Sequence, residues 1–340
     1  MRVAVTGATG NVGTSVVAAL AEESEVDAVL GIARRRPPLS VPKVEWCTAD
    51  VTSDDLVPLF RDADAVVHLV WVVQPNHNEH VLQRVNVDGS LRVLDAVAAA
   101  GVPVLVSASA FGAYSPGPKD RVVNESWPTH GIPRSWYSRQ KAYVERALDV
   151  FELNHPEVRV VRFRSALVLK REAGAQAHRL YGGPLLPRFF VRPSTVPAVV
   201  NIGGLRTQAV HSLDVGQAYR QAVVRDVRGA FNLAAEPVLD ATTMVDALEA
   251  PAVPVPAAVV RAGVSLSWRL RVQPTSPDWV DLLAETPLLD SSRARQELDW
   301  SPGHSATAAL VEFLEGVADG AGAATPPLLP LARARPSFRP

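Results

Sequence analysis

Residues 1–13 read MRVAVTGATGNVG and decide the fold that we expect for this chain. The apolar run over residues 3–5 predicts a strand, and the alanine- and valine-rich stretch over residues 11–21 predicts a helix. Between them, Gly7, Gly10 and Gly13 stand three residues apart. A glycine turn of this kind presents backbone N–H groups and the positive end of a helix dipole to a pyrophosphate. We therefore expect a dinucleotide site at this turn.

Each glycine has its own expected role in the turn. Gly7 permits the tight turn, Gly10 lets the backbone approach the phosphates, and Gly13 lets the helix pack close to the sheet. Glycines also gather in purely structural turns, which is the alternative reading. The strand before this turn and the helix after it supply the context that a dinucleotide motif requires. The other turn residues expected at the site are Thr9, Asn11 and Val12.

Strands and helices alternate along the first half of the chain. Apolar runs predict further strands over residues 27–33, 44–47, 65–70, 104–107 and 158–163. Helices are expected over residues 53–60, 86–100 and 135–153. This alternation is typical of an α/β fold, with a doubly wound parallel sheet covered on both faces. After about residue 170 prolines multiply, which is typical of functional loops or a small subdomain.

Tyr137 and Lys141 form the second informative pattern. On a helix, residues four apart lie one turn apart on one face, so both side chains can reach one ligand. An unperturbed phenol has a pKa of about 10, and a nearby ammonium group lowers that pKa by favouring the phenolate. An accidental pair on an amphipathic helix is the alternative. Lysine occurs elsewhere only at positions 43, 119 and 170, so a chance Tyr-x-x-x-Lys match is less expected in this chain.

With its glycine spacing and its Tyr-x-x-x-Lys, the chain resembles the extended short-chain dehydrogenase/reductase family, the NAD(P)-dependent epimerase/dehydratase group. The resemblance covers about residues 1–318 and is thin over 172–200 and 240–285. It implies a Rossmann-type dinucleotide domain over 1–170. A mixed segment over 171–318 would combine substrate-binding insertions, forming a smaller C-terminal subdomain, with returning core elements. In this family Tyr137 would be the general acid/base, and Lys141 would also hold the nicotinamide ribose.

The resemblance implies further site residues at strand ends. Asp50 and Val51 match the position that meets the adenine, and His68-Leu69-Val70 matches a strand end that flanks the cofactor mainly through its backbone. The family normally places a catalytic hydroxyl where this chain has Ala110. Ser109 or Ser107 could take its place if a β-bulge shifts the strand end. We expect Ser109 to have this role, with a serine that only satisfies the backbone as the alternative.

The end of the second expected strand bears on cofactor choice. NAD enzymes generally have an acidic residue there, whereas an arginine accommodates the 2′-phosphate of NADP. The acidic position falls on Ala33, and Arg34 and Arg35 follow it. Guanidinium groups suit bidentate phosphate contacts. We expect NADP(H), with NAD as the alternative cofactor and a solvated basic loop as the alternative role of the arginines.

These residues predict an NADP(H)-dependent oxidoreductase that acts on a hydroxyl or carbonyl carbon of a small molecule. A nucleotide-sugar epimerase or dehydratase with transient hydride transfer is the alternative within catalysis. A non-catalytic NADP-binding redox sensor is the alternative from another class, and Ala110 supports it, whereas the Tyr137/Lys141 pair argues against it.

Composition and net charge limit the kinds of binding partner that we expect. Hydrophobic residues make up 47% of the 340 residues and charged ones 20%, as in an ordinary soluble protein, and the net charge of −1 favours neither nucleic acid nor an anionic membrane. A single cysteine, Cys47, excludes an intramolecular disulfide, and no cysteine cluster suggests a metal. We expect a cytoplasmic protein without a signal peptide, and a homodimer is an open alternative. The Ala/Pro/Arg-rich residues 319–340 predict a disordered tail.

Overall fold

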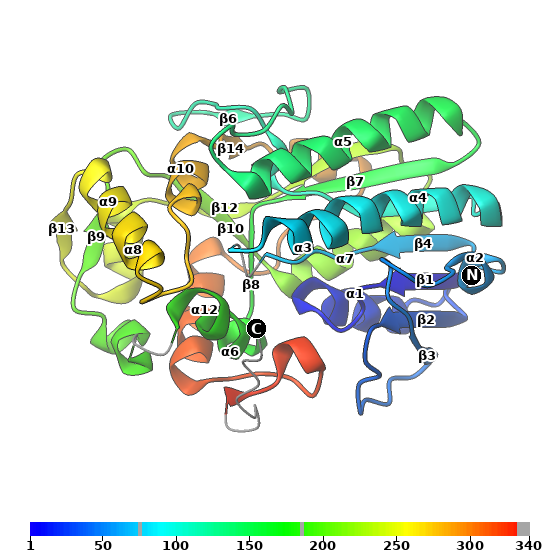
Figure 1. Ribbon diagram of the computed structural model, residues 1–340, viewed down its shortest axis with the longest axis horizontal. Helices are drawn as coiled ribbons and strands as arrows, with labels where there is room; N and C mark the ends of the chain where they lie inside the picture. Colours follow the sequence, from blue (N-terminus) through cyan, green and yellow to red (C-terminus); the bar gives the residue numbers. More distant parts are fainter. Residues whose placement is uncertain (74–76, 184–186, 332–340) are drawn as a thin grey trace.

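A computed structural model describes residues 1–73, 77–183 and 187–331 of the chain. Its centre is a seven-stranded sheet in the order β11-β7-β5-β4-β1-β2-β3, and all neighbouring strands in it are parallel (Figure 1). The strands are β1 (Arg2–Thr6), β2 (Ala28–Ala33), β3 (Val44–Thr48), β4 (Ala65–His68), β5 (Val104–Ala108), β7 (Arg159–Ser165) and β11 (Gly229–Leu233). This confirms the expected α/β fold with a parallel sheet.

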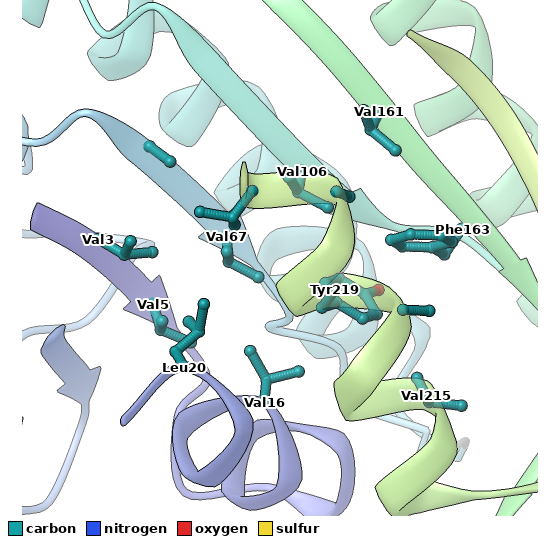
Figure 2. Close-up of a cluster of buried hydrophobic side chains, with 14 of the residues drawn as sticks. Val3, Val5, Val16, Leu20, Val67, Val106, Val161, Phe163, Val215 and Tyr219 are labelled. Carbon is teal, nitrogen blue, oxygen red and sulfur yellow. The ribbon is translucent and has the colours of Figure 1, made fainter. Parts of the chain in front are cut away.

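Helices cover both faces of this sheet, as the continuous apolar strands require. On one face lie α1 (Asn11–Glu22) and α7 (Ser212–Val224), and on the other lie α2 (Val57–Phe60), α4 (Gly89–Ala100) and α5 (Trp136–Asn154). Consecutive side chains of β1 point to opposite faces of the sheet, as successive side chains of a strand do. Val3 and Val5 pack with α1 and α7, whereas Ala4 packs on the other face. Figure 2 shows Val16 of α1 and Tyr219 of α7 in the first of these cores.

The helix expected over residues 86–100 differs from the structure at its start. Helix α3 (Glu79–Gln83) begins earlier and continues through a π-helical turn over Arg84–Asp88 into α4. Asn86 lies in this turn. Its side chain accepts a hydrogen bond from the backbone N–H of Val72 at 2.7 Å and donates one to the Val72 carbonyl at 2.8 Å. The turn therefore fixes the backbone that follows β4.

The second half of the chain returns to the main sheet and builds a smaller part beside it. β11 completes the seven-stranded sheet next to β7, as the expected return of core elements implies. In this smaller part, three strands form a sheet in the order β12-β10-β8. Two further two-stranded sheets consist of β13 with β9 and of β14 with β6. The bounds of these elements are β6 (Val122–Val123), β8 (Leu167–Leu169), β9 (Val199–Asn201), β10 (Thr207–His211), β12 (Ala235–Leu239), β13 (Ala252–Pro254), β14 (Leu288–Leu289), α6 (Gly174–Ala177), α8 (Ala241–Leu248), α9 (Ala257–Arg269), α10 (Asp278–Glu285), α11 (Ser292–Glu297) and α12 (Ala306–Asp319).

The C-terminal segment is ordered where the sequence predicted disorder. Asp319 ends α12, and residues 320–331 fold back against α6. Thr325 and Leu328 are fully buried, and the Arg179 guanidinium donates to the carbonyls of Pro327 and Leu329 at 2.9 and 2.8 Å. The disordered-tail expectation is therefore wrong for these residues, because buried apolar contacts and backbone hydrogen bonds offset the cost of ordering them. Residues 332–340 lie outside the described part.

Two glycines bring α12 against α6. A Cβ on Gly174 would lie 2.1 Å from the backbone carbon of Gly316, and a Cβ on Gly316 would lie 2.2 Å from the Arg171 carbonyl oxygen. Only glycine at both positions lets the two backbones approach so closely. Within the described ranges, no helix is long and apolar enough to cross a membrane.

Candidate active site

The glycine turn between β1 and α1 has the geometry that its sequence predicts. Gly7 has a φ of 74°, and a Cβ there would lie 3.0 Å from the backbone nitrogen of Val70. A Cβ on Gly13 would lie 2.2 Å from the Gly7 carbonyl oxygen, so Gly13 allows α1 to start directly against the turn. A Cβ on Gly10 would meet only the same oxygen, at 3.4 Å. The turn is thus closed towards the sheet and open at Gly10.

The first turn of α1 has polar groups available for an anion. Gly10 is the N-cap residue and supplies no side-chain cap, so the N–H groups of the first turn keep their hydrogen-bonding capacity. The buried Oδ1 of Asn11 has no hydrogen-bond partner within the described part of the chain. Beneath the turn, the buried Lys170 donates to the Asn11 carbonyl at 2.8 Å and to Thr14 Oγ1 at 2.6 Å. A positive charge therefore lies beneath the helix start, where it favours a bound anion.

A cavity of about 890 Å³ opens over this turn, at the carboxyl ends of the parallel strands, within the size range of ligand pockets. Most of the site residues predicted from the sequence line this cavity. Its lining includes Gly7, Thr9, Gly10, Asn11, Val12, Gly13, Arg34, Arg35, Asp50, Val51, Leu69, Val70, Ser109, Tyr137 and Lys141.

The end of β2 forms the basic side of the cavity. Arg34 and Arg35 are exposed, line the cavity and directly follow the buried Ala33. Asp50 accepts hydrogen bonds from the Thr52 N–H at 2.9 Å and the Thr52 hydroxyl at 2.8 Å. Burial alone would raise the pKa of Asp50, but these bonds and the charge of Arg34 hold it below its usual value. Asp50 is therefore an ionised acceptor near the Arg34 guanidinium.

Tyr137 and Lys141 lie one turn apart on α5, and both line the cavity. The Ser135 side chain caps this helix by accepting from the Ser138 N–H at 3.3 Å. The Lys141 ammonium donates to the Ala108 carbonyl at 2.9 Å and lies 3.5 Å from the centre of the Trp71 ring. Burial lowers the pKa of Lys141 to about 7, which the charge of Glu145 partly opposes.

The electrostatics of Tyr137 differ from the sequence-based expectation. Burial raises its pKa above the usual value, and the neighbouring Tyr181 raises it further. The ammonium of Lys141 is instead engaged by the Ala108 carbonyl and the Trp71 ring. In this geometry Tyr137 is a neutral phenol.

Ser109 occupies the strand end as expected, but its hydroxyl has a partner. Strand β5 pairs with β7 in a continuous register through Ala108, and the Ser109 N–H extends it to the Phe163 carbonyl at 2.9 Å. No β-bulge therefore re-aims Ser107 or Ser109. The Ser109 hydroxyl donates to the Glu145 carboxylate at 2.5 Å. The expected role of Ser109 as a donor to substrate requires this bond to open, so the geometry favours the alternative of a structural serine.

Aromatic rings surround Tyr137. The ring centre of Tyr137 lies 5.9 Å from that of Trp71, 6.0 Å from that of Trp136 and 5.2 Å from that of Trp279. Tyr181 packs edge-on against Trp279 at 5.6 Å. Trp71, Tyr181 and Trp279 come from the β4 end, the turn after α6, and α10, and all three line the cavity. This part of the site is mostly apolar.

The residues present fit a nicotinamide dinucleotide. The cradle of the turn excludes a Cβ at Gly7 and Gly13, the uncapped start of α1 offers N–H groups, and the cavity continues to Tyr137 and Lys141. The model for the NAD dependent epimerase/dehydratase family matches residues 3–182. The chain belongs to this family. The match confirms the resemblance inferred from the glycine spacing and the Tyr-x-x-x-Lys, and the family consists of NAD(P)-dependent enzymes of the oxidoreductase type.

Two curated relatives illustrate the sequence similarity. An uncharacterized protein of Mycobacterium tuberculosis (strain ATCC 25618 / H37Rv) is 28% identical over 316 residues, which cover 92% of this chain and 30% of that protein. The chain thus spans about 30% of the length of this relative. An L-arabinose 1-dehydrogenase (NAD(P)(+)) of Haloferax volcanii is 37% identical over 109 residues, covering 32% of this chain and 40% of that enzyme.

A solved structure shares the fold. The UDP-glucose 4-epimerase of Thermus thermophilus, in complex with NAD, superposes with a TM-score of 0.67 and 22% identity. The alignment covers 93% of this chain and 99% of the epimerase. This likeness confirms the family fold.

His68 is the one residue nominated for the cofactor site that does not line the cavity. Its Nδ1 lies 2.8 Å from Thr6 Oγ1, and its Nε2 lies 3.0 Å from Ser90 Oγ. Complete burial lowers its pKa to about 3, so the ring is neutral at physiological pH. His68 joins β1, β4 and α4, and only Leu69 and Val70 of its motif reach the cavity.

The sequence did not predict several residues that line the cavity. Trp71, Tyr181 and Trp279 were not nominated, nor were Phe313 of α12 and Pro326 of the C-terminal segment, which also line the cavity. Trp71 could have been predicted from the sequence, because it follows Leu69 and Val70, which were predicted to lie at the site, at a strand end. Tyr181 and Trp279 come from the regions where the resemblance is thin, whereas Phe313 and Pro326 lie near the C-terminal end of the described chain, and no local pattern links the four.

Proposed function

We propose that this chain is an NADP(H)-dependent oxidoreductase that acts on a hydroxyl or carbonyl carbon of a small molecule. One observation carries the proposal: Tyr137 and Lys141, one turn apart on α5, line the same cavity as the glycine turn. A dinucleotide on that turn and a substrate beside Tyr137 would share this cavity.

The end of β2 supports NADP(H) over NAD(H). Arg34 and Arg35 line the cavity, and Ala33 stands where an acidic residue would hold the ribose 2′-hydroxyl of NAD. Guanidinium groups bind phosphates strongly, because they offer paired N–H donors and a fixed charge. Arg34 and Arg35 would hold the 2′-phosphate, the first turn of α1 the pyrophosphate, and Asp50 and Val51 the adenine side.

When bound, the cofactor supplies or accepts a hydride at the nicotinamide ring. Tyr137 donates a proton to a substrate carbonyl oxygen during reduction, or accepts one from a hydroxyl during oxidation. Lys141 stabilises the phenolate that forms on Tyr137 and holds the ribose, which requires its ammonium to turn from the Ala108 carbonyl. The buried setting strengthens this charge interaction because the local dielectric is low.

The alternatives lead to different outcomes. A nucleotide-sugar epimerase or dehydratase would return its cofactor to the starting state, so no net change in NADPH would accompany turnover. A redox sensor would bind NADPH tightly and leave it unreacted. The missing hydroxyl at Ala110 is the feature that favours the sensor, and the Tyr137/Lys141 pair favours the enzyme.

Tyr137→Phe tests the proposal. The variant keeps the ring contacts but loses the proton-transfer group, so NADPH affinity should hold while NADPH oxidation with carbonyl substrates falls about 10²–10⁴-fold. Tyr143→Phe is the matched control, because Tyr143 lies on the same helix, is 54% exposed and does not line the cavity. Unchanged turnover in Tyr137→Phe, or NADPH that binds tightly but reacts with no member of a carbonyl and nucleotide-sugar panel, would overturn the proposal.

A further inference from the structure

We infer that the substrate is an uncharged, largely apolar ring compound carrying a ketone or secondary hydroxyl, and not a nucleotide diphosphate sugar. This inference rests on the proposed function and specifies its substrate class. It follows from the charges and the rings that the cavity presents beside Tyr137.

The arginines that line the described cavity lie on its cofactor side. The lysines and arginines among the described lining residues are Arg34, Arg35 and Lys141. Three strand spacings separate the end of β2, which carries Arg34, from the end of β5, which carries Ser109. Strands lie about 4.8 Å apart, so the two ends are about 14 Å apart across the sheet. The arginines therefore lie at the wrong end to hold a substrate diphosphate beside Tyr137.

Two basic residues whose partners lie at the cavity wall, Lys119 and Arg179, are engaged by the protein itself. The Lys119 ammonium donates to the carbonyls of Arg206 and Leu283 at 2.8 and 2.7 Å. The Arg179 guanidinium donates to Pro327 and Leu329, in the C-terminal segment. Phosphates buried without paired charges carry a large desolvation cost. Among the described lining residues beyond Arg34 and Arg35, the basic side chains that ionised phosphates of a nucleotide sugar could meet are Lys141 and His178.

The substrate side offers ring surfaces instead. Trp71, Tyr181 and Trp279 line the cavity around Tyr137, and Phe111 and Leu283 add to the same lining. Aromatic side chains bind flat rings by offset-stacked or edge-to-face contacts in addition to burying apolar area. Ala110, where the family normally has a hydroxyl, removes a further polar group. The site therefore selects for an apolar ring whose one required polar atom is the oxygen that meets Tyr137.

Equilibrium binding to the NADP⁺-saturated protein tests this inference with two probes, 2-tetralone and UDP-glucose, by isothermal titration calorimetry. The ketone cannot be reduced by NADP⁺, so its titration reports binding alone. We expect 2-tetralone to bind at least about tenfold more tightly than UDP-glucose. Trp279→Ala should weaken 2-tetralone binding by about tenfold, because it removes a ring contact and apolar area. NADP⁺ affinity should stay within about twofold.

Trp268→Ala is the matched control, because Trp268 lies outside the cavity lining, and it should leave 2-tetralone binding unchanged. Tyr181→Ala provides a second variant on a partly exposed ring if Trp279→Ala fails to fold. UDP-glucose binding more tightly than 2-tetralone, no measurable 2-tetralone binding, or 2-tetralone affinity unchanged in Trp279→Ala or Tyr181→Ala would overturn the substrate class. The proposed function fails separately, if the wild-type chain binds no NADP⁺.

Discussion

The Ser109 hydroxyl donates a 2.5 Å hydrogen bond to the Glu145 carboxylate, which lies one helical turn beyond Lys141 on α5. Glu145 also accepts from Arg164 at 2.9 and 3.0 Å and from Arg162 at 3.2 Å. Burial alone would raise the pKa of Glu145, but these partners lower it to about 2, so it is ionised throughout the physiological range. Ser109 is thereby tied to a permanently charged acceptor.

This relationship predicts a mainly structural effect of Ser109→Ala. Hydrogen bonds to charged groups contribute about 1.5–3 kcal/mol, so the free energy of unfolding should fall by about that amount in chemical denaturation. The turnover rate should fall less than about tenfold, because the hydroxyl proton is already engaged by Glu145. Ser107→Ala, on the same strand but outside the cavity lining, is the control for a buried serine. A rate loss of about 10²–10³-fold would instead show that Ser109 donates to the substrate.

Arg34 should determine the choice between NADPH and NADH. Calorimetric titration of the wild-type chain should show tighter binding of NADPH, by about 1.5–3 kcal/mol for each charge-assisted bond to the 2′-phosphate. Arg34→Ala should remove most of this preference and leave NADH affinity unchanged. Arg36→Ala is a matched control, because Arg36 is exposed on the same loop but does not line the cavity. Equal affinities in the wild-type chain, or tighter NADH binding that survives Arg34→Ala, would contradict the assignment.

The ammonium of Lys141 should titrate near neutral pH in the protein without cofactor. Its pKa is lowered to about 7 by burial, so the charge is present below pH 7 and is lost as the pH rises through that value. Lysine labelled with ¹³C at Cε gives one NMR resonance for each of the four lysines, and Lys141→Met assigns the one in question. Lys119 and Lys170, whose pKa values burial lowers to about 8, serve as internal controls.

The same titration predicts a pH dependence for catalysis. Above pH 7 the free enzyme loses the charge that stabilises a phenolate on Tyr137, so kcat/KM should decline as the pH rises. A Lys141 resonance that titrates only above about pH 10, the ordinary range of a hydrated lysine, would contradict both statements.

Local spacing in the sequence determined the parts of this protein that depend on neighbouring residues. The turn at Gly7, Gly10 and Gly13 follows from backbone sterics, which depend on residue type at fixed positions. The common face of Tyr137 and Lys141 follows from the helical period. The parallel sheet follows from the alternation of apolar strands with helices. None of these features needs knowledge of how distant segments pack.

Tertiary structure alone decided the rest of the site. Trp71, Tyr181 and Trp279 meet around Tyr137 although more than a hundred residues separate the first from the second, as their numbering shows. The Ser109 hydroxyl donates to the Glu145 carboxylate, and no sequence pattern connected these two residues. The Pro- and Ala-rich composition of residues 320–331 predicts disorder, yet packing against α6 orders them. These outcomes depend on the burial of one segment by another, which composition and periodicity do not encode.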